Sequence, residues 1–257
     1  MFLIGDPRFR PIIQLMDNAE YAEALHRLDD LLPGLSTEER PAGLYWTIQC
    51  LASLGDWKRA KALTQEALAL VEKQTPMGIR LELLNAYLLH SDQGPDKAAL
   101  EIRAILDRYG ALLRSENFLW IYLQAKSDLG NCLVNAGRYA EAIEELEEVL
   151  PLQDQPSFRY YIHFWLGIAN HELRKLKEAR NHFESAMAEA ESVPKGAIAP
   201  YYAARTRYEL ALIAYKQHRY EDALRQSDLA LAVGLQDPEL LQGVNRLKEL
   251  VGEVRAL

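Results

Sequence analysis

The sequence predicts an all-α fold, an α-solenoid of about six helix-turn-helix units followed by a C-terminal capping helix. Between Leu129 and Leu150, two apolar runs with the period of a helix are separated by a break at residues 135–137. Gly137 in that break can adopt the positive φ that ends a helix. The same two-helix pattern recurs along the chain, and a solenoid grows as one continuous body by such repetition.

A recurring alanine marks the second helix of each unit. That helix opens with an aromatic residue or leucine in most units, and the alanine follows three residues later, at spacings of 36 to 44 residues. The residue twelve positions before the alanine is small in four of the six units. Small residues at facing positions let two antiparallel helices approach to about 8–10 Å. The alanines are Ala24, Ala60, Ala98, Ala142, Ala179 and Ala223, and the earlier positions are Ile12, Ile48, Ala86, Gly130, Gly167 and Ala211.

The units follow one another in a single predicted domain that spans residues 1–257. Turn residues separate the two helices within a unit, as at Gly55-Asp56, and Pro95 suits the first turn of a second helix. Ser36 and Glu39 have the spacing of a capping box before unit two. Asp237-Pro238-Glu239 predicts the start of the capping helix, with an N-cap, a proline and an acidic first turn. The predicted units are 8–33, 42–73, 79–114, 115–150, 157–192 and 200–233, with the capping helix at 238–255.

Two stretches resemble the tetratricopeptide repeat family. Leu166-Gly167 is followed by Ala179, Phe183 and Ala186, and Leu129-Gly130 is followed by Gly137, Tyr139 and Ala142. The resemblance extends over residues 8–231, although the spacings exceed the usual length of about 34 residues. It implies a right-handed superhelix whose leading helices line a concave face. It also implies a non-enzymatic scaffold or adaptor that binds a protein or peptide segment in that groove.

The resemblance, carried over by helix phase, assigns a set of leading-helix residues to the concave face. They form a stripe of aromatic, apolar and hydrogen-bonding side chains with two arginines, and such anchors dominate interface energetics and suit grooves for peptide segments. The alternative is that these side chains pack between adjacent leading helices. The predicted residues are Tyr45, Gln49, Arg80, Leu83, Tyr87, His90, Gln124, Asn131, Tyr161, Phe164, Ile168, His171, Arg205, Tyr208, Leu212 and Tyr215.

One sub-class of the family holds a C-terminal carboxylate with lysines, asparagines and an arginine on three units. Asn131 fits one of these places, and Arg205 could replace a lysine. Ser127, Trp165 and Glu209 stand where a lysine, an asparagine and an arginine are needed. The sequence therefore does not support this clamp, and we do not expect binding of chaperone tails.

Charge and cysteine content restrict the partners. The net charge is −8 with a pI near 5.4, which disfavours nucleic acid and anionic membranes as partners. No run approaches the ~18 apolar residues of a membrane helix, and the apolar start before Gly5 is too short for a signal peptide. Cys50 and Cys132 lie on apolar helix faces, which predicts two reduced core thiols in a cytoplasmic protein.

Motifs for catalysis are missing from the sequence. The six histidines do not form a pair at i, i+4, and we find no phosphate-binding glycine loop and no nucleophile elbow. We therefore predict no catalytic residue, no metal and no cofactor. Two other functions stay open: a regulator in which a bound peptide tightens the superhelix, and, as a lesser alternative, an enzyme. Self-association through an end of the solenoid is left open too.

Overall fold

The computed structural model describes residues 7–18, 20–194, 197–233 and 237–255, and this part of the chain contains helices and turns but no strand. The all-α class is thereby confirmed. By its internal contacts the chain divides into two compact units, residues 1–145 and 146–257. That all 257 residues form one solenoid domain stays a prediction.

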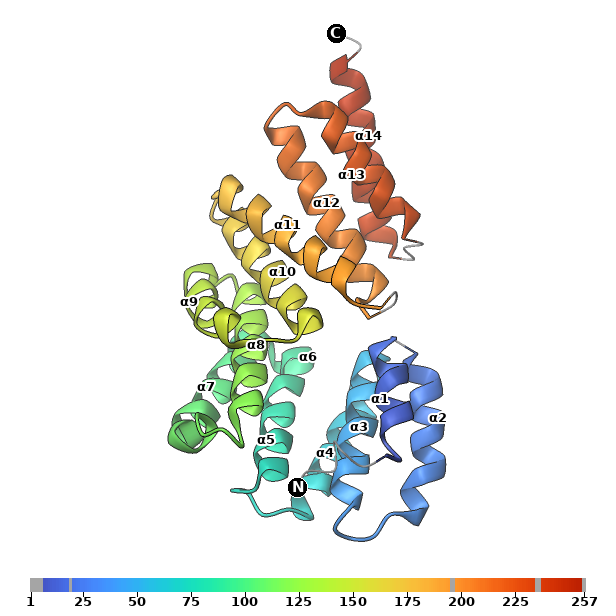
Figure 1. Ribbon diagram of the computed structural model, residues 1–257, viewed down its shortest axis with the longest axis vertical. Coiled ribbons are helices and arrows are strands. Elements are labelled where there is room, and N and C mark those ends of the chain that lie inside the picture. Colours follow the sequence, from blue (N-terminus) through green and yellow to red (C-terminus); the bar gives the residue numbers. More distant parts are fainter. Residues whose placement is uncertain (1–6, 19, 195–196, 234–236, 256–257) are drawn as a thin grey trace. The chain divides into compact units, whose positions relative to one another are not determined.

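The N-terminal unit consists of helices packed against their neighbours in sequence (Figure 1). The α1 helix packs on α2, α3 on α4, and α5 on α7, which also contacts α8. The leading helices α3, α5 and α8 also touch one another in that order, so they line one side of the unit. The helices are α1 (Arg10–Asp17), α2 (Tyr21–Leu31), η2 (Leu32–Gly34), α3 (Arg40–Ser53), α4 (Trp57–Ala69), α5 (Pro76–Leu88), α6 (His90–Gln93), α7 (Pro95–Leu113) and α8 (Leu119–Asn135).

The C-terminal unit repeats the same arrangement. The α10 helix pairs with α11 and α12 pairs with α13, and α14 covers the last pair by packing on α12 and α13. The leading helices α10 and α12 touch each other. The α9 helix (Tyr139–Val149) lies across the division between the units. The remaining elements are η3 (Leu150–Leu152), α10 (Pro156–Glu172), α11 (Leu176–Ser192), α12 (Pro200–Lys216), α13 (Tyr220–Ala232) and α14 (Pro238–Arg255).

The recurring small residues are buried, as predicted. All six marker alanines have 0% of their surface exposed, and the six residues twelve positions earlier are buried as well. Gly167 shows why the position must be small, because a Cβ atom there would lie 2.5 Å from Cε1 of Phe183 on the paired helix. In this pair the close approach of two helices depends on a glycine facing a phenylalanine.

Left-handed residues end the leading helices at equivalent places. Gly55, Gly137, Arg174 and His218 have φ between 58° and 80°, and each lies five residues before a marker alanine. The next backbone N–H then bonds back to a carbonyl five residues earlier, as in Arg138 to Leu133. This is the 6→1 bond of a Schellman motif, which satisfies a carbonyl at the helix end. The prediction for Gly137 is confirmed.

Helix starts agree with the predicted caps but not with every predicted boundary. The Ser36 N–H bonds to Glu39 at 2.9 Å, and Asp237 accepts from the Leu240 N–H at 2.7 Å. The α3 and α5 helices begin at Arg40 and Pro76, before the predicted 42 and 79. Each helix has a proline in its first two positions, where backbone N–H groups have no partner within the helix. The N–H that proline lacks is therefore no loss there, and the helix can begin earlier. The α8 helix begins at Leu119 rather than 115, since residues 114–118 form turns and a bend.

Candidate partner-binding pocket

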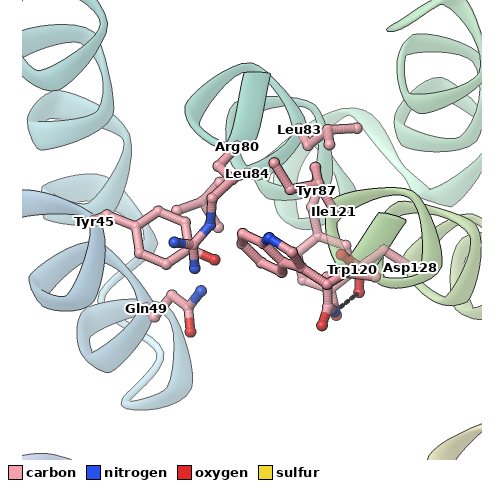
Figure 2. Close-up of a pocket in the computed structure, with 10 residues that line it drawn as sticks. Tyr45, Gln49, Arg80, Leu83, Leu84, Tyr87, Trp120, Ile121 and Asp128 are labelled. Atoms are coloured by element: carbon pink, nitrogen blue, oxygen red, sulfur yellow. Dashed lines mark hydrogen bonds between the residues drawn. The ribbon is translucent and has the colours of Figure 1, made fainter. Parts of the chain in front are cut away.

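An open pocket lies where α3, α5 and α8 meet in the N-terminal unit (Figure 2). Its cavity volume is about 100 Å³, so it has room for a side chain rather than a large ligand. Six of the predicted concave-face residues line it, and they come from all three helices. The lining residues are Tyr45, Gln49, Arg80, Leu83, Leu84, Tyr87, Trp120, Ile121, Gln124 and Asp128.

Arg80 holds the centre of the pocket. Its guanidinium carbon lies 3.8 Å from the centre of the Tyr45 ring and 4.3 Å from that of Trp120. Figure 2 shows the guanidinium between these two rings, facing the open space of the pocket. A third ring, Trp46, lies 5.5 Å away and meets Tyr45 edge to face. Aromatic residues of α3 and α8, the two helices that flank α5, therefore fix the position of the cation.

The Arg80 side chain is almost fully buried without a counter-ion. Only 6% of the residue is exposed, and no carboxylate in the described part of the chain forms an ion pair with it. Its Nε atom is buried and has no hydrogen-bond partner there. Cation–π contacts contribute about 0.5–2 kcal/mol each, whereas removing an ion from water costs several kcal/mol. The pocket thus contains a cation whose charge the fold leaves uncompensated.

Asp128 of α8 lines the same pocket as Arg80 of α5. It accepts a hydrogen bond from the Gln124 amide at 3.0 Å. Burial raises the pKa of the Asp128 carboxyl to about 7, and the bond from Gln124 lowers it only in part. Near neutral pH the pocket therefore carries less negative charge than its one acidic residue suggests.

We expect Asp128→Asn to stabilise the protein at alkaline pH. A folded-state pKa above the ordinary value means that the folded state holds the proton more tightly than the unfolded state. Stability then falls as the pH rises from about 4 to about 7. Asparagine stays neutral, so the expected gain at pH 8 is between about 1 and 4 kcal/mol, with little gain at pH 4. Urea unfolding at both pH values measures this, with exposed Asp107→Asn as the control. An equal gain at both pH values would contradict the assignment.

Two further predicted residues lie next to the pocket. The Asn131 amide on α8 donates to the Tyr87 hydroxyl on α5 at 3.1 Å. His90 stacks on Tyr87 at 6.4 Å, and burial lowers the pKa of its imidazole. These contacts connect the ends of α5 and α8 and hold Tyr87 at the edge of the pocket.

In the C-terminal unit, the predicted polar residues His171 and Arg205 both contact one buried carboxylate, that of Glu209. Glu209 is 2% exposed and accepts from Arg205 Nη2 at 2.6 Å, and it lies 2.7 Å from His171 Nδ1. Lys216 Nζ lies 2.7 Å from the other nitrogen of that ring. Burial alone would raise the pKa of Glu209, but the hydrogen bond from His171 and the charge of Arg205 together lower it. Unlike Arg80, Arg205 already has its counter-ion.

The other predicted residues of the C-terminal unit belong to its packing to different degrees. Phe164 is 2% exposed and lies in the core among rings of α11 and α12. Gly243 of α14 has no room for a Cβ atom beside the Tyr208 ring. The rest are half-buried: Tyr161 packs edge to face on Tyr202, Tyr215 packs on Tyr220, and Ile168 and Leu212 belong to the leading helices α10 and α12. Burial of Phe164 favours packing over direct contact with a partner.

Comparison with known proteins identifies the repeat. A family model described as the tetratricopeptide repeat matches residues 128–194, the stretch that contains both the Gly137 turn and the contact of Gly167 with Phe183. Residues 128–194 therefore belong to the tetratricopeptide repeat family. No curated protein matches it in sequence.

Solved structures of tetratricopeptide repeat proteins and related helical-repeat proteins share the fold of the chain at low sequence identity. PilF of Pseudomonas aeruginosa is 20% identical with a TM-score of 0.62, over 85% of this chain and 87% of that chain. PilW, a type IV pilus biogenesis factor, is 14% identical with a TM-score of 0.63, over 94% and 99%. A Rap protein complexed with competence and sporulation factor is 15% identical with a TM-score of 0.66, over 87% and 62%. These likenesses show the fold.

Four residues that line the pocket are not among those predicted from the sequence: Leu84, Trp120, Ile121 and Asp128. Trp120 and Asp128 stand four residues on either side of the predicted Gln124, so the helix period places all three on one face of α8. That signal was present in the sequence. The pairing of Trp120 with Arg80, forty residues away, had no such signal.

Within the described residues, no group of three or more histidine, cysteine, aspartate or glutamate side chains could hold a metal ion. None of the helices in the described ranges has the length and apolar character needed to cross a membrane.

Proposed function

We propose that the protein is a non-enzymatic scaffold or adaptor that binds a segment of a partner protein in the pocket between α3, α5 and α8. The observation that carries the proposal is the exposed opening over a cluster of rigid anchors, in which Tyr45, Trp120 and Arg80 hold one another in place. Tyrosine, tryptophan and arginine are the residue types that dominate binding energies at interfaces. Anchors that are already ordered lose little entropy when a partner binds.

The shape of the pocket suits a segment better than a compact small molecule. It is open to solvent along helices that lie side by side, and Gln49 offers a side-chain amide without a hydrogen-bond partner in the described part of the chain. A primary amide can donate a hydrogen bond to a backbone carbonyl of a bound peptide and accept one from a backbone N–H of the same peptide. A peptide in extended form presents both groups.

The cytoplasm is the compartment that we propose. Cys50 and Cys132 are free and buried, and burial raises the pKa of each thiol to about 12. Thiols in this state are protonated and unreactive, as expected of packing residues in a reducing compartment.

Site-specific photo-crosslinking in the native host tests the proposal. A photoreactive phenylalanine analogue replaces Gln49 at the pocket, and a matched protein carries it at Ala104, an exposed position on the trailing helix α7. We expect a protein adduct from position 49 that is absent from position 104 and that disappears when Trp120 is also replaced by alanine. The same adducts from both positions, or none from position 49, would contradict the proposal.

The second candidate is a regulator that senses a peptide. The observation in its favour is the fold that the chain shares with the Rap protein, whose structure contains competence and sporulation factor. In that case, a peptide bound between the leading helices would tighten the helix stack and alter another surface. Small-angle scattering with and without a bound peptide separates the candidates, since a scaffold leaves the profile unchanged and a sensor compacts it.

A further inference from the structure

We propose that Arg80 binds a side-chain carboxylate, so that the partner segment is acidic and places an aspartate or glutamate in the pocket between α3, α5 and α8. This inference rests on the proposed function and names the chemistry of the segment. Arg80 acts in it as a binding residue, not as part of the core.

The first argument is the missing counter-ion. Among the described residues, Lys126 is the other well-buried cation on a leading helix, and it forms an ion pair with Glu145. Arg205 is likewise paired with Glu209 in the C-terminal unit. Arg80 is 6% exposed and has neither an ion pair nor a partner for its buried Nε. A buried charge left alone destabilises a fold, so its presence at the opening of a pocket points to a ligand that supplies the negative charge.

The second argument is preorganisation. Tyr45 and Trp120 flank the guanidinium at 3.8 and 4.3 Å, which fixes its plane and leaves its edge toward the open pocket (Figure 2). The edge of a guanidinium matches a carboxylate through two parallel hydrogen bonds. Because aromatic contacts already hold the side chain, little rotamer entropy is lost when a carboxylate arrives. The partly enclosed site also strengthens the attraction between the charges.

The third argument concerns the class of anion. The lining of the pocket contains one cation, Arg80, and one acidic side chain, Asp128. A phosphate with nearly two negative charges would meet one guanidinium and one acidic group, whereas phosphate sites gather several cations or N–H donors. A singly charged carboxylate fits this balance. The unpaired amide of Gln49 beside it favours a carboxylate carried on a continuing backbone over a chain end.

The test is a peptide selection followed by a double-mutant cycle on the full chain. Random twelve-residue peptides are displayed in two libraries, one flanked on both sides and one with a free C-terminus. Both are selected on the wild-type protein and counter-selected on Arg80→Met, which keeps the length of the side chain but removes the charge. Enriched peptides are synthesised with acetylated and amidated ends, and each acid is replaced by its amide. Fluorescence anisotropy then gives the dissociation constants.

We expect peptides from the flanked library that share an aspartate or glutamate. Replacing that acid should weaken binding to the wild type about tenfold or more and leave binding to Arg80→Met unchanged. Equal losses on both proteins, peptides without an acid, or binding only through a free C-terminus would overturn the inference. In those cases, binding that is lost in Trp120→Ala would still support the proposed function. No enriched peptide from either library would count against both.

Unfolding of the same variants separates binding from packing. If Arg80 serves binding, Arg80→Met should be folded with a melting temperature at or above that of the wild type, because the buried charge is gone. Arg80→Lys keeps a charge without the planar fork and should bind the acidic peptide more weakly than the wild type. An unfolded Arg80→Met protein together with a lysine variant of full affinity would show that Arg80 is structural and overturn the inference.

Discussion

Replacing Phe164 by alanine is expected to lower the free energy of unfolding by about 3–5 kcal/mol. Phe164 is 2% exposed and contacts the rings of Trp165, Phe183 and Tyr202 at centroid distances of 4.8 to 6.3 Å. Truncation would leave a cavity among aromatic side chains from three helices, which cannot close without moving them. Urea unfolding followed by circular dichroism measures the loss. The variant should lose helical content at temperatures where the wild type is folded.

Tyr201→Ala provides the matched control for this measurement. Tyr201 belongs to the same aromatic region but is 41% exposed, so its truncation should change stability by less than about 0.5 kcal/mol. The difference in stability between Phe164→Ala and Tyr201→Ala decides whether Phe164 is a core residue or a surface residue. A Phe164→Ala protein of wild-type stability that has lost partner binding would make Phe164 a contact residue and contradict its assignment to the core.

Replacing Ala179 by leucine is expected to cost about 1–3 kcal/mol by overpacking. Ala179 is fully buried where α11 meets α10, in the same pair in which Gly167 touches Phe183. Three added carbon atoms have no space there unless the two helices separate. The expected result is a lower urea midpoint with an unchanged slope of the transition, which indicates lower stability without a change in the surface exposed on unfolding.

Ala188→Leu is the control on the same helix. Ala188 is exposed on α11, so leucine there should leave the midpoint close to that of the wild type. Equal effects at positions 179 and 188 would mean that the marker alanine does not face the paired helix. The repeat alignment would then be wrong in this unit.

The sequence predicted the helix pairs because their determinants are local. A small residue on each helix and a left-handed turn between them recur at nearly constant offsets, and Gly137 and Ala142 could be identified without coordinates. The boundaries were less certain because prolines extended some helices and short turns delayed others. Arg174 and His218 occupy the left-handed position without being glycine, so no residue type marked those turns.

The candidate site could be predicted only in part. Helix phase placed Tyr45, Arg80 and Gln124 on one side, and the structure brings them together. In α10, by contrast, buried residues cover most of the helix circumference, so periodicity could not separate Phe164 from residues at the open surface. Contacts between residues distant in sequence determine two features of the structure. One is the pairing of His171 and Arg205 with Glu209, and the other is the position of Arg80 between Tyr45 and Trp120. Periodicity within one helix does not report these contacts.

Hydrogen–deuterium exchange of the wild-type protein, with and without the selected acidic peptide, tests the central claim most directly. Binding in the pocket predicts slower exchange confined to residues 40–53, 76–88 and 119–135, the helices α3, α5 and α8 that contribute its lining. The same peptide with its acid replaced by the amide should give no protection at equal concentration. Protection confined instead to helices α10 to α14, or unchanged exchange in α3, α5 and α8 at a saturating peptide concentration, would contradict the claim.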